Sequence, residues 1–331
     1  MKIYRKRYVS INEFYIFSFS LIITFYLLLM ERSIGIGWDF HPDSVTYATK
    51  SSEIASAVYG GTLPFFNNGY YVLSSILGMN IFVITFMNML FFSYTNVMIY
   101  RIHKSASKFI KRGKTIWILC LLLLICNPYR MHLATTMLKD SLIIMLLVFA
   151  FSNKTFSKII MLPFLSLFRI VSIAYFSIFF KRIYVFLGIS FVLLLWAILG
   201  DIVNVLILKF NSVEMVFRDF DRIPTFQDQG IIGAIMRSII WPILAFTGGF
   251  VFLSPDPAYA IVSSGIFASL FYMILMTGRV HISLSAYATM MLFGILVTGF
   301  TSYLRYVYPI IVVLPLIAIQ SKAIINMKKY A

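Results

Sequence analysis

The stretch FYIFSFSLIITFYLLLM at residues 14–30 decides the fold class, because it is 17 residues long and carries no charged side chain. A helix needs about 20 apolar residues to cross the hydrocarbon layer of a bilayer, with shorter helices at the low end of the range. The stretch lacks a small-residue cleavage site, so we interpret it as a retained first membrane span. Basic residues precede it at Lys2, Arg5, Lys6 and Arg7, and Glu31 and Arg32 follow it.

The composition of the whole chain is that of a membrane protein. Hydrophobic residues make up 60% of the 331 positions and charged residues 12%, whereas soluble proteins are about 45–50% apolar. We therefore predict an all-α, polytopic transmembrane helix bundle that forms one integral membrane domain over residues 1–331. The length leaves room for about ten spans, some of them short or broken, with amphipathic segments on the outer side.

The charges divide between the two sides of the membrane. Eleven of the twelve acidic residues can be placed outside, and most lysines and arginines fall in short loops that this arrangement places inside. Positive charge in short loops is a topology signal, so the net charge of +16 does not indicate a nucleic-acid partner. The basic N-terminus and the C-terminal Lys322, Lys328 and Lys329 predict that both termini are cytoplasmic.

Three loops define this topology. Residues 31–70 form the first extracytoplasmic loop, with four acidic residues against two basic ones. Residues 101–114 form a cytoplasmic loop with six basic residues. Residues 201–258 form a second extracytoplasmic loop, in which residues 231–253 are a candidate re-entrant segment because Pro and Gly interrupt them at Trp241-Pro242 and Gly248-Gly249.

Residues 159–180 admit two interpretations because Arg169 lies near their middle. They form either one span with a costly central arginine, or a hairpin of two short helices with Arg169 at the outer turn. The hairpin places the five acidic residues of segment 201–229 outside. Charge distribution therefore favours the hairpin, although acidic residues are weak topology determinants.

Ionisable residues gather on the predicted outer side, at the ends of apolar helices or within them. Such groups are costly at membrane depth and are functional candidates by default; the alternative is a set of ion pairs that lock helices together. Arginines exceed the nearby carboxylates, and guanidinium groups bind phosphate oxygens bidentately, which favours a lipid-linked phosphate or pyrophosphate. The candidates are Asp43, Arg130, His132, Lys139, Asp140, Arg169, Arg218, Arg222, Arg237 and Arg305.

Two of the carboxylates are candidates for acid–base chemistry. Pro42 is suited to start a helix, and Asp43 in its first turn is either a general base for a sugar hydroxyl or a helix-dipole partner. Asp140, beside Lys139, is either catalytic or a cap and local ion pair. His41 and His132 suggest a proton relay, or a metal site with nearby aspartates; we predict neither a bound metal nor a cofactor. No nucleotide-binding loop, nucleophile elbow or zinc-protease motif occurs.

Short motifs resemble two related groups of membrane glycosyltransferases. His41-Pro42-Asp43-Ser44, followed by Tyr47, resembles the polyprenyl-phosphate-dependent glycosyltransferases of the C superfamily. A series of four motifs, in order along the chain, resembles the Wzy/EpsG-like polysaccharide polymerases. These motifs are Pro128-Tyr129-Arg130, Leu138-Lys139-Asp140-Ser141-Leu142, Phe168-Arg169 and Arg305-Tyr306-Val307-Tyr308-Pro309.

The resemblance implies an enzyme of the bacterial inner membrane that polymerises undecaprenyl-pyrophosphate-linked oligosaccharides for O-antigen or capsule. It implies that Arg130, Arg169 and Arg305 hold the carrier pyrophosphate and that Asp43 or Asp140 handles the acceptor proton. Membrane lipids and a chain-length regulator protein are the implied partners. The further substrate-binding candidates are Lys139, Arg218, Arg222 and Tyr306.

Two other functions compete with polymerisation. A transferase that adds one polyprenyl-phosphate-linked sugar is mechanistically close, and a flippase or transporter of lipid-linked sugars belongs to another class. Transporters often show paired broken helices in related halves, whereas here the breaks are unmatched and the charges lie on one face. The sequence thus favours an enzyme. The charged run Arg218-Asp219-Phe220-Asp221-Arg222 either binds substrate or forms ion pairs among its own side chains.

Overall fold

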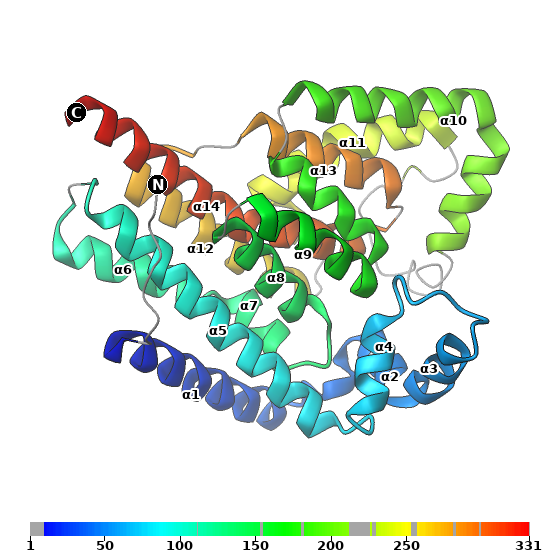
Figure 1. Cartoon of the computed structure of the whole chain (residues 1–331), viewed down its shortest axis with the longest axis horizontal. Helices are drawn as coiled ribbons and strands as arrows, with labels where there is room; N and C mark the ends of the chain where they lie inside the picture. Colours follow the sequence, from blue (N-terminus) through cyan, green and yellow to red (C-terminus); the bar gives the residue numbers. More distant parts are fainter. Residues whose placement is uncertain are drawn as a thin grey trace. The chain divides into compact units, whose positions relative to one another are not determined.

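The computed structural model describes most of the chain, and every regular element in the described part is helical (Figure 1). The all-α prediction is therefore confirmed for these residues. The described residues are 10–110, 112–152, 155–179, 182–211, 226, 230–252, 257–280, 283–297 and 299–330.

Six helices of the described chain are long and apolar enough to cross a membrane, which confirms the membrane-embedded character. Three shorter apolar helices accompany them, at Asp140–Ser152, Phe186–Gly200 and Leu284–Leu296. The number of about ten spans and the orientation of the termini stay predictions. The six long helices are Ile11–Ser33, Ile81–Ser107, Lys114–Ala134, Gly230–Thr247, Tyr259–Thr277 and Phe300–Met327.

The chain divides into two compact units, and the first contains Met1–Ile173, Ala268–Val280 and Pro315–Ala331. Helix α5 (Ile81–Ser107) is its centre: α1 (Ile11–Ser33), α6 (Lys114–Ile125), α7 (Pro128–Ala134) and α8 (Asp140–Ser152) all pack against it (Figure 1). Polar side chains join these apolar helices, because lipid offers no alternative hydrogen-bond partner.

Polar side chains connect α1 to α5 near the start of α1 and again in its middle. Ser10 caps α1 in a capping box with Glu13, and Glu13 pairs with Arg101 of α5 at 3.0 Å. Deeper in the bundle, the Asn96 side chain of α5 donates a hydrogen bond to the Ser20 hydroxyl of α1 at 3.0 Å. These contacts fix the register of α1 along α5.

Four short helices lie between α1 and α5 and form the blue cluster of Figure 1: η1 (Trp38–Phe40), α2 (Pro42–Thr49), α3 (Ser51–Tyr59) and α4 (Gly69–Ile76). Pro42 is the first residue of α2, as the sequence predicts. The Ser74 hydroxyl of α4 donates to the Tyr47 carbonyl of α2 at 3.1 Å. The first predicted loop is therefore a folded helical segment.

Two helix breaks position charged residues in the first unit. Asn127 caps the start of α7 by accepting a hydrogen bond from the Arg130 backbone N–H, which separates α7 from α6. Helix α9 (Thr155–Phe168) ends directly before Arg169, and the 3-10 helix η2 (Ile170–Phe179) follows. The α-helix therefore does not continue through Arg169, and the hairpin with Arg169 at its outer turn stays a prediction.

The second unit contains Ala174–Phe267 and His281–Leu314. Its helices are α10 (Arg182–Asn211), α11 (Gly230–Thr247), η5 (Gly249–Phe252) and α13 (Leu284–Leu296). Helices α12 (Pro257–Thr277) and α14 (Phe300–Tyr330) contribute residues to both units. Gly294 permits close packing of α13 on α11, because a Cβ there would lie 2.8 Å from the Ser238 Cα.

The predicted second outer loop contains more helix than the sequence suggests. Helix α10 continues through residue 211 with a kink at Gly200. Helix α11 continues through Pro242 and ends just before Gly248, whose φ is +61°. Pro242 therefore does not break the helix, and α11 is long enough to cross the membrane by itself.

The predicted orientation is testable by cysteine labelling. Glu53 on α3 and Lys108 after α5 are both exposed and lie in the loops predicted to face opposite sides. In a background with both cysteines replaced (Cys120→Ala, Cys126→Ala), we expect Glu53→Cys to react with a membrane-impermeant maleimide added to right-side-out vesicles. Lys108→Cys should react only after permeabilisation. The opposite labelling pattern would invert the topology.

Candidate functional site

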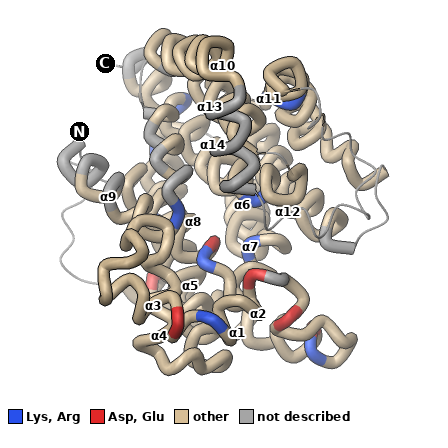
Figure 2. Tube along the Cα trace, turned by 90° about the vertical axis from the view of Figure 1, so that its right-hand side faces the viewer, with Lys and Arg blue, Asp and Glu red and all other residues tan. Residues whose placement is uncertain are grey.

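Several ionisable residues of the first unit lie on α2 and at the ends of longer helices, among them Glu31, Lys139, Asp140 and Arg169. In Figure 2 the red acidic positions lie around the labels of α1 to α5, with blue basic positions among them. Every Asp and Glu whose side chain the structure describes belongs to this unit. They are Glu13, Glu31, Asp39, Asp43, Glu53 and Asp140.

A hydrogen-bonded chain runs from Glu31 through His132 to His41. One Glu31 carboxylate oxygen lies 2.7 Å from His132 Nδ1, and the other accepts a hydrogen bond from the Thr135 hydroxyl at 2.5 Å. His132 Nε2 lies 2.9 Å from His41 Nε2. Glu31 and His132 are buried and His41 is half-buried, so the chain extends from the interior toward the surface.

The hydrogens in this chain follow from the chemistry of its atoms. An ionised carboxylate only accepts hydrogen bonds, so Nδ1 of His132 carries a hydrogen. The two facing Nε2 atoms share one hydrogen, because one must donate and the other accept. The Phe40 ring lies edge-on to both imidazoles, with centroid distances of 5.1 Å to His41 and 5.7 Å to His132.

Asn88 of α5 holds the connection between α7 and α8 in place. Its side-chain NH₂ donates to the carbonyls of Thr136 at 2.7 Å and Leu138 at 2.9 Å. Its side-chain oxygen accepts from the Tyr70 hydroxyl at 3.3 Å. Burial raises the pKa of Tyr70, so the hydroxyl stays protonated and remains a donor. This arrangement fixes the segment that leads into α8, which begins at Asp140.

Lys139 and Asp140 occupy that start, and both are buried. Lys139 Nζ lies 6.0 Å from the centre of the Tyr47 ring of α2, which is within range of a cation–π contact. Asp140 lies 2.9 Å from an Nη atom of the buried Arg169. The structure thus brings three of the predicted site residues together.

The end of α9 is fixed by the start of α4, and this determines where Arg169 lies. The Asn67 backbone N–H donates to the Ser166 carbonyl at 3.1 Å. Gly69 approaches α9 so closely that a Cβ there would lie 2.9 Å from the Leu167 carbonyl oxygen. Only glycine fits this contact without displacement of the backbone, so the close approach positions the arginine that follows.

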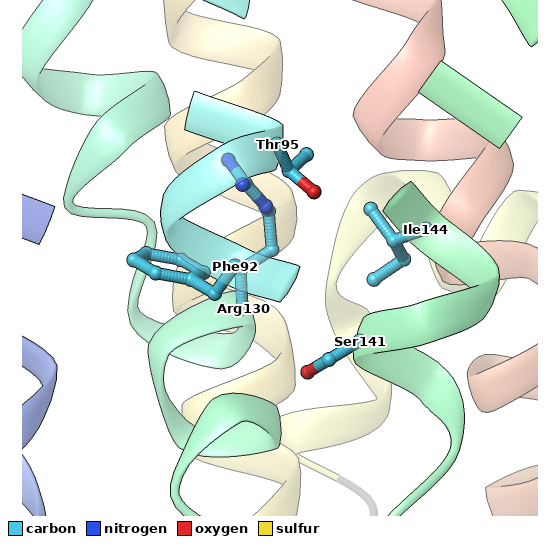
Figure 3. A pocket seen from close by; sticks show the side chains of 5 residues that line it. All are labelled: Phe92, Thr95, Arg130, Ser141 and Ile144. Carbon is cyan, nitrogen blue, oxygen red and sulfur yellow. The ribbon is translucent and has the colours of Figure 1, made fainter. Parts of the chain in front are cut away.

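Arg130 is directed into the bundle. Its guanidinium donates to the Leu124 carbonyl and to the Asn96 side-chain oxygen, each at 2.7 Å, and lies 4.9 Å from the Phe92 ring centre. It also lines a small hollow with Phe92, Thr95, Ser141 and Ile144 (Figure 3). The space in it for a water-sized molecule is about 10 Å³, close to the least that a single water needs, so this hollow does not suit a saccharide.

Comparison of the chain with protein-family models, curated proteins and solved structures finds no significant match. A function therefore has to be inferred from the side chains of the first unit. Within the described residues, no group of three or more His, Cys, Asp or Glu side chains is placed to hold a metal ion.

The remaining candidates lie apart from this cluster in the chain. Arg305 and Tyr306 are half-buried residues of α14 in the second unit, and the Tyr306 carbonyl accepts from the Tyr175 hydroxyl at 2.8 Å. Arg237 is buried in α11 and donates to the Gly294 carbonyl at 3.1 Å. The predicted ligands Arg218 and Arg222 lie outside the described residues.

Sequence reasoning missed Glu31 and Asn88 as parts of the site. The sequence indicated Glu31 only as a charged residue that follows the first span. Its hydrogen-bond partners lie about one hundred residues away in the chain. A carboxylate at the end of an apolar helix and an amide within one are both unusual in lipid. That pattern was the available signal for both residues.

Asp140 and Arg169 should depend strongly on one another. Asp140→Asn or Arg169→Gln alone leaves a buried charge without this ion-pair partner, which typically costs about 3–5 kcal/mol. We expect the double variant to be much less destabilised than the sum, as measured by unfolding of the purified protein in detergent. The pair Glu13 and Arg101 is the matched control, because the Arg101 side chain is 33% exposed, and we expect a weaker coupling there, nearer the 1 kcal/mol of exposed pairs. Additive effects at Asp140 and Arg169 would show that the pair is not coupled.

Proposed function

We propose that this protein is a membrane glycosyltransferase that acts on polyprenyl-pyrophosphate-linked oligosaccharides at the outer face of the bacterial inner membrane. Its reaction is the polymerisation of repeat units for O-antigen or capsule. The observation that supports this most directly is the gathering of acid–base groups and cations in one unit of an apolar bundle. Glu31, His132 and His41 supply the acid–base groups, and Lys139 and Arg169 are cations in the same unit.

The proposed chemistry assigns these groups to the two halves of a glycosyl transfer. The acceptor hydroxyl attacks the anomeric carbon of the donor, the bond to the carrier pyrophosphate breaks, and the hydroxyl proton passes to a base. Asp43 lies in the first turn of α2, two residues after His41, where a carboxylate is suited to receive that proton. Lys139 and Arg169 are suited to stabilise the negative charge that develops on the leaving pyrophosphate.

The partners of the arginines refine these roles. Arg169 faces Asp140 at 2.9 Å, so the carrier pyrophosphate has to compete with that carboxylate for the guanidinium. Asp140 then serves to hold Arg169 in position. Arg130 donates to neutral acceptors within the bundle, and its contribution to the pyrophosphate site is a positive potential.

Exposed apolar side chains near the site suit a lipid-linked substrate. The turn between α3 and α4 carries Tyr59, Leu63, Phe65 and Phe66, each at least 40% exposed. Aromatic residues are enriched where a membrane protein meets the lipid–water interface. A polyprenyl carrier remains in the membrane while its pyrophosphate and saccharide reach the surface, so a site at helix ends matches its geometry.

A single-sugar transferase of the C superfamily is the second candidate. The observation that favours it is the position of Asp43 on the first turn of the first helix after His41, in the loop that follows the first span. A flippase of lipid-linked sugars also uses cations near the membrane surface. The three functions differ in the glycan that accumulates when the protein is lost.

Deletion of the gene in the source strain tests the proposed function. We expect the glycan ladder on a gel to collapse to the core plus one repeat unit, because transport and ligation of that unit continue without polymerisation. Loss of even the single repeat would indicate an earlier transferase or a flippase. An unchanged ladder would reject the glycan assignment.

Variants that complement the deletion test the assigned residues. We expect Asp43→Asn, Arg169→Ala and Arg305→Ala, at equal expression, to reduce the polymer by about 100-fold or more, the lower range for loss of an acid–base or electrostatic contribution. Arg112→Ala, in the loop predicted to be cytoplasmic, is the control and should leave the ladder intact. A full ladder with all arginine variants, Arg130→Ala included, would contradict pyrophosphate binding. Unchanged polymer with Asp43→Asn would assign Asp43 to the helix N-terminus.

A further inference from the structure

We propose that the turn between α3 and α4 is an interfacial membrane anchor, which inserts its apolar side chains into the headgroup region of one leaflet. That leaflet is the one on the side of the first loop, which the predicted topology makes the outer one. The inserted side chains are those of Tyr59, Leu63, Phe65 and Phe66, and the partner is the phospholipid bilayer itself. The anchor does not depend on the reaction that the protein catalyses, so this inference goes beyond the proposed function.

The sequence around the turn contains no charged residue. Residues 54–100 carry no charged side chain, although the span α5 begins only at Ile81. About 25% of the residues of soluble proteins are charged, so a loop in water would carry several charges over residues 54–80. An uncharged segment of this length, which continues directly into a span, is suited to contact with lipid.

The exposed side chains change from charged to aromatic along α3. Lys50 and Glu53, at its start, are exposed, and so is Tyr59, its last residue, at 67%. Glu53 and Tyr59 lie six residues apart, which is about 9 Å along a helix axis. Phe65 and Phe66 follow in the turn and are 42% and 50% exposed. Apolar side chains of an interfacial segment enter the boundary between headgroups and acyl chains by about 5–10 Å, so α3 is long enough to connect water with that boundary.

The polar groups of the turn are bonded within the protein, which contact with lipid requires. The backbone N–H groups of Thr62 and Leu63 both donate to the Ala57 carbonyl, at 2.9 and 3.1 Å. Pro64 has no N–H to satisfy. The Thr62 hydroxyl also donates to the Ala57 carbonyl, at 2.9 Å, and the Asn68 side-chain NH₂ donates to the Pro64 carbonyl at 2.8 Å. These groups therefore keep their hydrogen bonds when lipid replaces water around the turn.

The rest of the unit holds α4, and with it one end of the turn. Helices α3 and α4 pack side by side (Figure 1). The Tyr47 ring of α2 lies 4.8 Å from the ring centres of both Tyr70 and Tyr71. The hydrogen bond from the Asn67 N–H to the Ser166 carbonyl joins the turn to α9. The aromatic side chains of the turn are therefore presented by a supported part of the chain.

The apolar surface continues from the turn into a membrane span, and this favours lipid over a protein partner. Ile76, the last residue of α4, is 69% exposed, and Phe82, in the first turn of α5, is 81% exposed. Helix α5 is itself long and apolar enough to cross the membrane. Along the chain, exposed apolar side chains thus lead from the turn to a helix whose outer face contacts lipid.

The first measurement is the depth of nitroxide labels on the full chain in lipid nanodiscs, in the background with Cys120→Ala and Cys126→Ala. One label is placed at Phe66→Cys, and the matched control is at Glu53→Cys on the same pair of helices. We expect the label at position 66 to collide more with oxygen, which concentrates in lipid, than with a water-soluble nickel chelate. Its depth should be about 5–10 Å below the headgroup boundary. The label at position 53 should show the reverse preference.

Each other result contradicts the anchor. A label at position 66 that collides mainly with the nickel chelate would place the turn in water. A label that neither reagent reaches would show that protein covers the turn, such as a second copy of the chain. The turn carries no lysine or arginine, so we expect the same depth in nanodiscs of zwitterionic lipid as in nanodiscs with anionic lipid. Insertion only with anionic lipid would contradict a contact made by apolar side chains.

The second measurement uses the unmodified chain, so that it does not depend on the folding of a variant. The nanodiscs contain a phospholipid with a photoreactive diazirine near the top of one acyl chain, and mass spectrometry locates the adducts. We expect adducts at residues 59–66 and on α1, and none at residues 49–53. Adducts on α1 without adducts at residues 59–66 would overturn the proposal.

Discussion

The hydrogen bonds that Glu31 receives from the α7 turn are the interaction on which the first unit depends. A buried carboxylate is tolerated only when it is paired and hydrogen-bonded, and here Thr135 and His132 satisfy its two oxygens. The bond joins the end of the first span to a turn about one hundred residues later. Asn88 holds the other side of that turn. The start of α8 therefore has little freedom to move, and Lys139 and Asp140 are held in place.

The sequence predicted the broad architecture because hydropathy depends on composition over many residues. The apolar stretch at residues 14–30 lies within α1, Pro42 starts α2, and α9 ends at the costly Arg169. Pro242 suggested a broken helix, but α11 continues through it. A proline removes one backbone hydrogen bond of a helix, which neighbouring helices make tolerable in a membrane, and α11 packs against α13.

The side-chain pairs within the site could not be predicted from the sequence, because they join helices that are far apart along the chain. The sequence offered Asp140 as a catalytic residue or as a helix cap paired with Lys139, and Arg169 as a phosphate ligand or part of an ion pair, without identifying them as partners. The structure places the two 2.9 Å apart. Glu31 shows the same limit more strongly. Its position at the end of an apolar span marks it as unusual, but only the structure shows that its partner is His132.

Gly69 makes the turn between α3 and α4 mechanically continuous with the end of α9. Bare backbone faces bare backbone there, with no flexible side chain between them to absorb a displacement. A side chain at position 69 would therefore push the end of α9 away, and Arg169, which follows that end directly, would move relative to Asp140. The geometry of a buried ion pair thus depends on the absence of a single methyl group on a different helix.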